Sequence, residues 1–212
     1  MDIYSTEDQQ IEAIKRWWQE YGKAIILGSA IGLAGLFGWR YYLSQQLESR
    51  AAGAEAFEQV SRELATRGSE AFDSTAAFVS ANQGNSYGEL AALLLAAEAV
   101  KANDLALASA QLEQALAGTD DAVLRNTIGL RLARVLIARG EYEAAQSRLD
   151  QVSGEAFAAQ KLEVQGDLYL AQQQPAEAHD AYEQARSAGG VGENPALTLK
   201  LDHLATPARQ GE

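Results

Sequence analysis

The sequence predicts an all-α protein in which a single N-terminal transmembrane helix precedes a solenoid of helical repeats. One uncharged apolar stretch, residues 24–39, occurs near the start of the 212-residue chain. The remainder is rich in alanine, leucine, glutamate and glutamine, which favour helix, and almost no strand pattern occurs. From residue 89 onward, similar segments recur at offsets of 37 and 33 residues.

Residues 1–22 are predicted to form a cytoplasmic amphipathic segment. Ile11, Ile14 and Trp18 share one helical face, and this face can lie along a membrane surface.

Residues 23–43 are predicted to be an uncleaved signal anchor. The 16 uncharged residues fall short of the roughly 20 that a bilayer requires, but Lys23 and Arg40 at the two ends can extend their charges toward water. Tryptophan and tyrosine crowd both ends, as they do at membrane interfaces. These aromatic residues argue against the alternative of a buried helix in a soluble protein. A cleaved signal peptide fits poorly, because 23 residues precede the stretch and no small-residue cleavage site follows closely.

The orientation of the anchor follows from its flanking charges. Lys15, Arg16 and Lys23 precede the apolar stretch, whereas Arg40 and Arg50 follow it. This slight excess favours a cytoplasmic N-terminus, with the large C-terminal part on the other side of the membrane.

Small residues mark one face of the predicted anchor. A spacing of four residues allows a second helix to approach closely, although glycine is common in membrane helices and an incidental origin stays open. The predicted contact residues are Ala24, Gly28, Gly32 and Gly35.

Residues 44–86 are predicted to be linking helices. Phe57, Val60 and Leu64 share a face of a helix that runs on from the anchor and ends at Gly68. A short helix is expected at 74–82, followed by a turn at 84–86.

Residues 87–212 are predicted to hold about three repeats and a closing helix at 194–205. In each repeat an alanine lies four residues before a larger side chain in the second helix: Ala108 with Leu112, Ala145 with Leu149, and Ala178 with Tyr182. The third copy matches the tetratricopeptide signature best, at Leu162, Gly166, Tyr169, Ala178, Tyr182 and Ala185. Small residues let the paired helices approach, so Gly166 is expected to face Ala178.

The composition argues against catalysis and nucleic-acid binding. The residues after Leu43 carry 13 basic and 24 acidic side chains, which would repel nucleic acid, and solubility alone explains such acidity. There is no cysteine, and the two histidines, His179 and His203, lie within helical patterns. No catalytic, metal or cofactor motif occurs, so we expect a protein that is not an enzyme, with no cofactor and no metal.

Repeat solenoids act by offering a concave surface to a partner, and the first helix of each repeat lines that surface. The predicted groove residues are Leu93, Ala97, Lys101, Thr127, Leu130, Arg134, Gln160, Glu163 and Asp167. Because the third copy contributes two acids, this set fits poorly with repeat domains that bind the acidic C-termini of cytosolic chaperones.

The whole chain resembles the YfgM family, the ancillary subunit of the bacterial SecYEG translocon. The likeness is carried by residues 10–18 (QIEAIKRWW), Gly22-Lys23, residues 38–41 (GWRY), Tyr87-Gly88 and residues 130–134 (LRLAR). It implies a single-pass protein of the bacterial inner membrane with a cytoplasmic N-terminus and a periplasmic repeat domain.

The resemblance also implies partners: the SecYEG translocon, a membrane-anchored periplasmic chaperone related to prolyl isomerases, translocating polypeptides and membrane lipid. The implied function is a scaffold that helps to hand translocated proteins to periplasmic chaperones. An alternative is an envelope-stress regulator that binds and restrains a phosphorelay response regulator.

Overall fold

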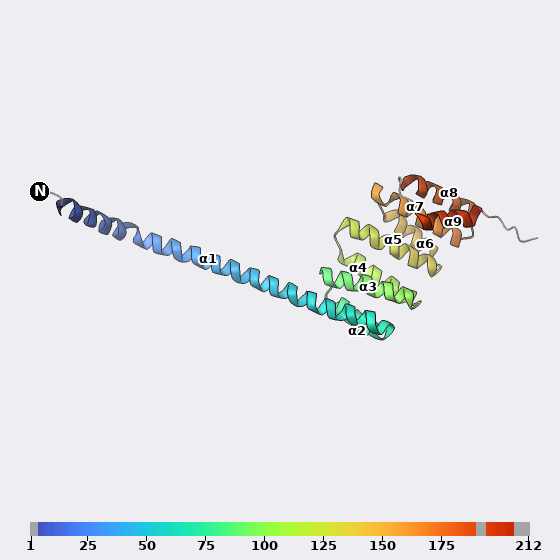
Figure 1. The fold of residues 1–212 in the computed structure, drawn as a ribbon, viewed down its shortest axis with the longest axis horizontal. Coiled ribbons are helices and arrows are strands. Elements are labelled where there is room, and N and C mark those ends of the chain that lie inside the picture. The colour runs from blue at the N-terminus through green and yellow to red at the C-terminus, as the bar shows by residue number, and fades with distance from the viewer. Residues whose placement is uncertain (1–3, 190–193, 206–212) are drawn as a thin grey trace, which may run out of the picture. The chain divides into compact units, whose positions relative to one another are not determined.

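The computed structural model describes residues 4–189 and 194–205, all of whose regular elements are helices. The chain divides into two compact units, Met1–Ala54 and Glu55–Glu212. Helix α1 (Tyr4–Arg67) supplies the first unit and enters the second (Figure 1). Residues 1–3 of the predicted N-terminal segment, together with residues 190–193 and 206–212 of the predicted repeat domain, lie outside the described residues.

The first unit is helical and exposes its apolar side chains. Ile26, Leu27 and Ile31 are each at least 60% exposed. Gly28, Gly32 and Gly35 have open space where a Cβ atom would stand, whereas Gly22 packs against the Trp18 ring. Ala24 lies in the helix, but its side chain is outside the described part.

Length and apolarity decide whether a helix can span a bilayer. Within the described ranges, no single helix combines the required length and apolarity, whereas Ile14–Lys23 and Ile26–Ala81 reach them together as a pair bent by 46°.

The second unit begins with the end of α1, the short 3-10 helix η1 (Gly68–Ala71) and α2 (Phe72–Ala81). The predicted helix end at Gly68 is confirmed, because this glycine has a φ of 55° and begins η1. Leu64 is buried in a cluster with Leu95, and the Phe57 and Tyr87 rings lie 5.9 Å apart. The linking helices therefore pack on the first repeat.

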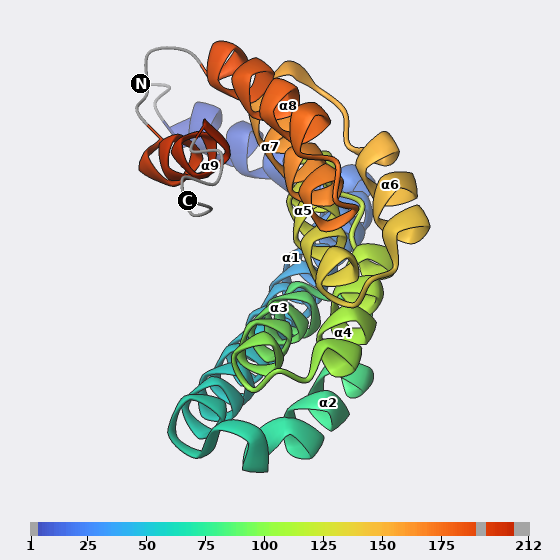
Figure 2. The ribbon, with the colours of Figure 1, turned by 90° about the vertical axis from the view of Figure 1, so that its right-hand side faces the viewer.

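Three helical hairpins follow, with the register that the repeats predict. They are α3 (Ser86–Lys101) with α4 (Leu105–Gly118), α5 (Ala122–Ala138) with α6 (Tyr142–Gln151), and α7 (Glu155–Ala171) with α8 (Pro175–Ala188), and α9 (Pro195–Ala205) closes the series. Figure 2 shows the hairpins stacked in chain order, with α4 packed on α5 and α6 on α7.

The same turn joins the two helices of each hairpin. Asn103, Gly140 and Gln173 occupy it with φ of 60°, 77° and 62°. The next residue's N–H donates to a carbonyl five residues earlier, over 2.8 Å in the first hairpin and 2.9 Å in the other two. Because the positions are separated by 37 and 33 residues, the backbone repeats with the period of the sequence.

Side chains of the second helices build much of the core. Ala108, Ala145 and Ala178 are each fully buried, as their place in the repeat predicts. One expected pairing differs: the atoms nearest to a Cβ on Gly166 belong to the Tyr182 ring, at 2.4 Å, and not to Ala178. Tyr182 lies one helical turn beyond Ala178 on the same face, and its ring fills the space that Gly166 leaves.

Candidate partner-binding groove

An apolar concavity of the repeat domain lies between α3 and α5. It has a volume of about 460 Å³, and four of the nine predicted groove residues line it: Leu93, Ala97, Lys101 and Arg134. Ala96, Leu112 and Val135 are buried residues at its base. We call this concavity the α3–α5 groove.

Sequence reasoning missed the three buried residues at the base of this groove and two further, exposed residues, Val100 and Arg131. Each lies three positions from a predicted residue on its own helix, Val100 after Ala97 and Arg131 before Arg134. Because residues three or four apart share a helical face, this spacing was the signal that could have found them. Val100 is 45% exposed, so the groove presents an aliphatic side chain to solvent.

The charges at the groove are positive and partly unpaired. Lys101 pairs with Glu98 on its own helix at 2.6 Å. Arg131 and Arg134 are exposed and have no polar partner among the described residues. In the described part of the second unit, the other arginine and lysine side chains each have an ion pair or a hydrogen bond, at positions 62, 67, 101, 125, 139, 148, 161, 186 and 200.

Two predicted groove residues of the second repeat, Thr127 and Leu130, do not line the α3–α5 groove. Leu130 is only 2% exposed and belongs to the core, so its side chain packs within the domain. Thr127 is half-buried, and its hydroxyl donates to the carbonyl of Val123 on its own helix.

The predicted residues of the third repeat contact the closing helix. Lys200 of α9 pairs with both Glu163 and Asp167, each at 2.7 Å. Gln160 is exposed beside a separate cavity of about 200 Å³ that Glu163 and Leu197 also line. The structure therefore brings the first-repeat residues and Arg134 together, and it places the third-repeat acids in an internal network.

Tyr182 completes that internal network. Its hydroxyl donates to the Asp167 carboxylate at 2.8 Å, and the Lys200 ammonium lies 5.5 Å from the ring centre. Burial of the ring, together with the hydrogen bond and negative charge of Asp167, raises the pKa of Tyr182. No local sequence pattern indicates the ion pair of Lys200 with Glu163, because 37 residues separate them.

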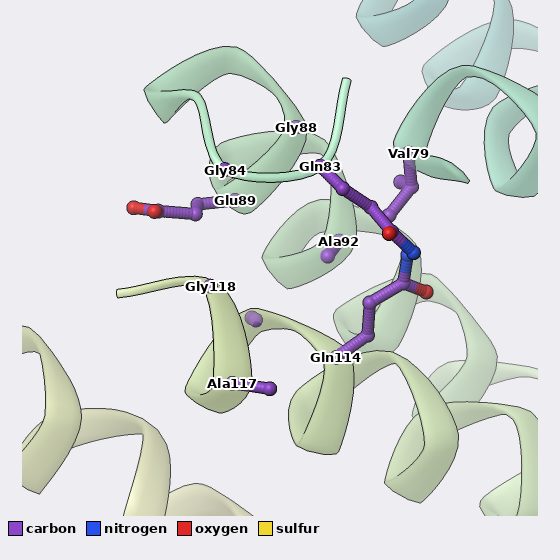
Figure 3. Close-up of a pocket in the computed structure, with 10 residues that line it drawn as sticks. Val79, Gln83, Gly84, Gly88, Glu89, Ala92, Gln114, Ala117 and Gly118 are labelled. Atoms are coloured by element: carbon purple, nitrogen blue, oxygen red, sulfur yellow. The ribbon is translucent and has the colours of Figure 1, made fainter. Parts of the chain in front are cut away.

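A second concavity, of about 400 Å³, lies where α2 ends and α3 begins (Figure 3). Gln83 and Gln114 extend toward each other there beside Val79, and Glu89 extends away from them (Figure 3). Burial and the nearby charges of Asp120 and Asp121 raise the pKa of Glu89. No group of three or more potential metal ligands exists among the described residues.

Gly88, which lines this second concavity, allows α3 to begin close to the end of α2. A Cβ on Gly88 would stand 2.1 Å from the carbonyl oxygen of Asn82, so only glycine allows α3 to start this close to the end of α2. The Asn85 side chain accepts from the N–H groups of Tyr87 and Gly88, and this caps α3.

Comparison with known proteins gives concordant results. The model of a tetratricopeptide repeat-like domain matches residues 15–206. An ancillary SecYEG translocon subunit of Escherichia coli strain K12 is 37% identical over 183 residues, which cover 86% of this chain and 88% of that protein. The subunit of the same name from Haemophilus influenzae is 34% identical over 198 residues, covering 93% and 97%. No solved structure matches the chain.

Proposed function

Since this chain belongs to the YfgM family of ancillary SecYEG translocon subunits, we propose that it is a membrane-anchored, non-enzymatic scaffold of the Sec translocon. In this proposal its repeat domain holds partners on the periplasmic side and helps to hand translocated proteins to chaperones. The observation that carries the binding role is the open, apolar α3–α5 groove, which has the place and chemistry of a protein-docking surface.

The exposed apolar side chains of the first unit support anchoring in the inner membrane. Exposure of an uncharged run of Ile, Leu, Phe and Trp side chains to water is unfavourable, and such exposed apolar surface marks a membrane or protein contact. The Trp17 and Tyr21 rings lie 6.1 Å apart before this run, and the Trp39 and Tyr42 rings lie 6.4 Å apart after it. Such rings favour the two interfaces of a bilayer. We assign residues 1–22 to the cytoplasm, 23–43 to the membrane, and the linking helices 44–86 and repeat domain 87–212 to the periplasm.

The two units take different partners in this proposal. The glycine face of α1 contacts a helix of the translocon, because glycine lets a second helix approach closely, whereas it forms no comparable contact with lipid tails. The repeat domain contacts a membrane-anchored, prolyl-isomerase-like chaperone or the emerging polypeptide itself.

The test is photocrosslinking in native membranes. A photoreactive residue at Gly28 is expected to capture translocon subunits, and one at Ala97 is expected to capture a periplasmic chaperone or a translocating chain. Position Gln184, which is exposed on α8, serves as the control. Capture of cytoplasmic response regulators at Ala97, or the same products at Ala97 and Gln184, would contradict the proposal.

A further inference from the structure

We propose that the α3–α5 groove binds a partner segment that combines apolar side chains with carboxylates, and that Arg131 and Arg134 pair with those carboxylates. This inference rests on the proposed scaffold function and specifies the chemistry of the segment that the groove holds.

The groove itself supplies the apolar part of the proposed binding surface. Leu93, Ala97 and Val100 line it, above buried residues that include Leu112. Its volume of about 460 Å³ has room for a few aliphatic side chains but not for a folded surface. Burying such side chains is favourable, and ordering the partner offsets part of this gain.

Two arginines of an otherwise acidic molecule supply the charged part of the proposed binding surface. The chain has 17 basic and 29 acidic residues. Most of the basic side chains described in the second unit form ion pairs or hydrogen bonds with other residues of the chain. Arg131 and Arg134, which have no polar partner among the described residues, share one helical face and border the same apolar concavity. Lys101, which pairs with Glu98 at 2.6 Å, also lies at that border.

Unpaired guanidinium groups beside a low-dielectric surface attract anions more strongly than they would in open water. Their planar form also suits paired hydrogen bonds to carboxylates. An apolar segment with acidic residues therefore complements the groove better than an apolar segment with basic residues.

The third repeat does not oppose this preference. Its inward acids, Glu163 and Asp167, would repel an acidic segment if they were free. Lys200 pairs with both of them at 2.7 Å, and Tyr182 also donates to Asp167. Lys200 and Tyr182 thus occupy the acids of the third repeat, whereas Arg131 and Arg134 of the second repeat have no polar partner among the described residues.

The experiment uses the full-length protein in detergent and three matched fluorescent peptides. The first is built of leucine, alanine and glutamate, and the others carry glutamine or lysine in place of every glutamate. Fluorescence anisotropy is expected to show tightest binding of the glutamate peptide. The double variant Arg131→Gln/Arg134→Gln should weaken that binding about tenfold, which corresponds to two exposed ion pairs of about 0.7 kcal/mol each. Binding of the glutamine peptide should stay unchanged.

Arg186→Gln is the matched control, because Arg186 lies on α8, outside the groove, and pairs with Glu183. Val100→Asn should weaken binding of the glutamate and glutamine peptides alike. Equal binding of all three peptides, equal losses in the double variant and the control, or preference for anionic phospholipid vesicles over the glutamate peptide would overturn the inference. If the crosslinks at Ala97 persist in that case, the scaffold function stands and only the segment's chemistry is wrong. If those crosslinks are absent as well, the scaffold function fails too.

Discussion

At the scale of single residues, Gly166 shows how a missing side chain sets the spacing of a hairpin. A Cβ at this position would lie 2.4 Å from the Tyr182 ring, which is fully buried and tied to Asp167 by its hydroxyl. The ring cannot move aside without breaking that hydrogen bond. We therefore predict that Gly166→Ala lowers the free energy of unfolding by about 1–3 kcal/mol, measured by urea denaturation followed by circular dichroism.

Gln172→Ala is the control for this prediction. Gln172 is exposed at the end of α7, so the change should stay within about 0.5 kcal/mol. Equal stabilities of the two variants would mean that the Tyr182 ring does not press on Gly166.

Glu89 gives a prediction about pH. Burial and the charges of Asp120 and Asp121 raise its pKa in the folded state above the ordinary value of 4.5. The folded chain therefore binds this proton more readily than the unfolded chain does. The resulting stability is fully present below pH 4.5 and is lost as the pH rises through the folded pKa.

We expect Glu89→Gln to raise the stability at pH 7 by at most about 0.5 kcal/mol, since the side chain is largely solvated and the α3 N-terminus favours its charge. The gain should vanish at pH 4 (about the point where both states are protonated). Urea denaturation at both pH values measures the difference, with Glu113→Gln, an exposed change on α4, as the control. A gain of the same size at both pH values would show that charge is not its cause.

At the scale of elements, the hairpins could be predicted because their information is local. Asp104 and Asp121 accept from N–H groups three residues ahead and cap α4 and α5, and Gly140 holds the left-handed turn between α5 and α6. Asn103 and Gln173 hold the same turn with side chains that do not favour it as glycine does, so only the repeat period indicated those turns.

The groove was harder to predict than the hairpins, because neighbouring positions on one helix differ in burial. Leu130 is in the core, whereas Arg131 beside it reaches the groove. To predict which of Leu130 and Arg131 lines the groove, one must know which side of α5 is turned toward α3. The contact of Lys200 with Glu163 spans 37 residues and depends on how α9 docks, which no local pattern encodes.

The docking of α9 can be tested through Lys200. Its ammonium is 2.7 Å from two carboxylates and near the Tyr182 ring, so Lys200→Met leaves two partly buried acids without their cation. We predict that amide hydrogen exchange in α9 accelerates about tenfold, which corresponds to a loss of about 1.4 kcal/mol. Exchange in α4 should not change.

Lys161→Met is the matched control, since the polar partner of Lys161 among the described residues is the carbonyl of Val152, which precedes α7. Unaltered exchange in α9 of the Lys200→Met protein would show that Leu197 and Leu201 hold this helix without the ion pairs.

The glycine face of α1 is the other testable element. Gly28 and Gly32 have open space where a Cβ would stand. Gly28→Leu/Gly32→Leu keeps the helix apolar, so membrane insertion should persist. Recovery of translocon subunits from mild detergent should fall about threefold, the factor for the ~0.6 kcal/mol typical of a contact between membrane helices.

Ala30→Leu/Ala34→Leu serves as the control, because it has the same spacing on the opposite face of the helix. Equal recovery with both double variants would show that this segment is a plain anchor.

At the scale of the whole molecule, the proposed function depends on which side of the membrane the repeat domain occupies. Three basic residues flank the apolar stretch on its N-terminal side and two on its C-terminal side, which favours a cytoplasmic N-terminus. The resemblance to the family implies the same orientation. A groove that meets translocated chains must lie in the periplasm. A regulator of a cytoplasmic phosphorelay needs the opposite orientation.

Protease treatment of spheroplasts separates these two arrangements. Protease added outside is expected to digest the chain after Leu43 and to leave a membrane-protected fragment that carries an N-terminal epitope tag. Immunoblotting detects this fragment, and lysed spheroplasts, in which both sides are accessible, provide the control. Full-length protein that survives in intact spheroplasts and disappears only after lysis would place the groove in the cytoplasm. That result would favour the envelope-stress regulator, because the exposed cations Arg131 and Arg134 would then face cytoplasmic proteins instead of translocated ones.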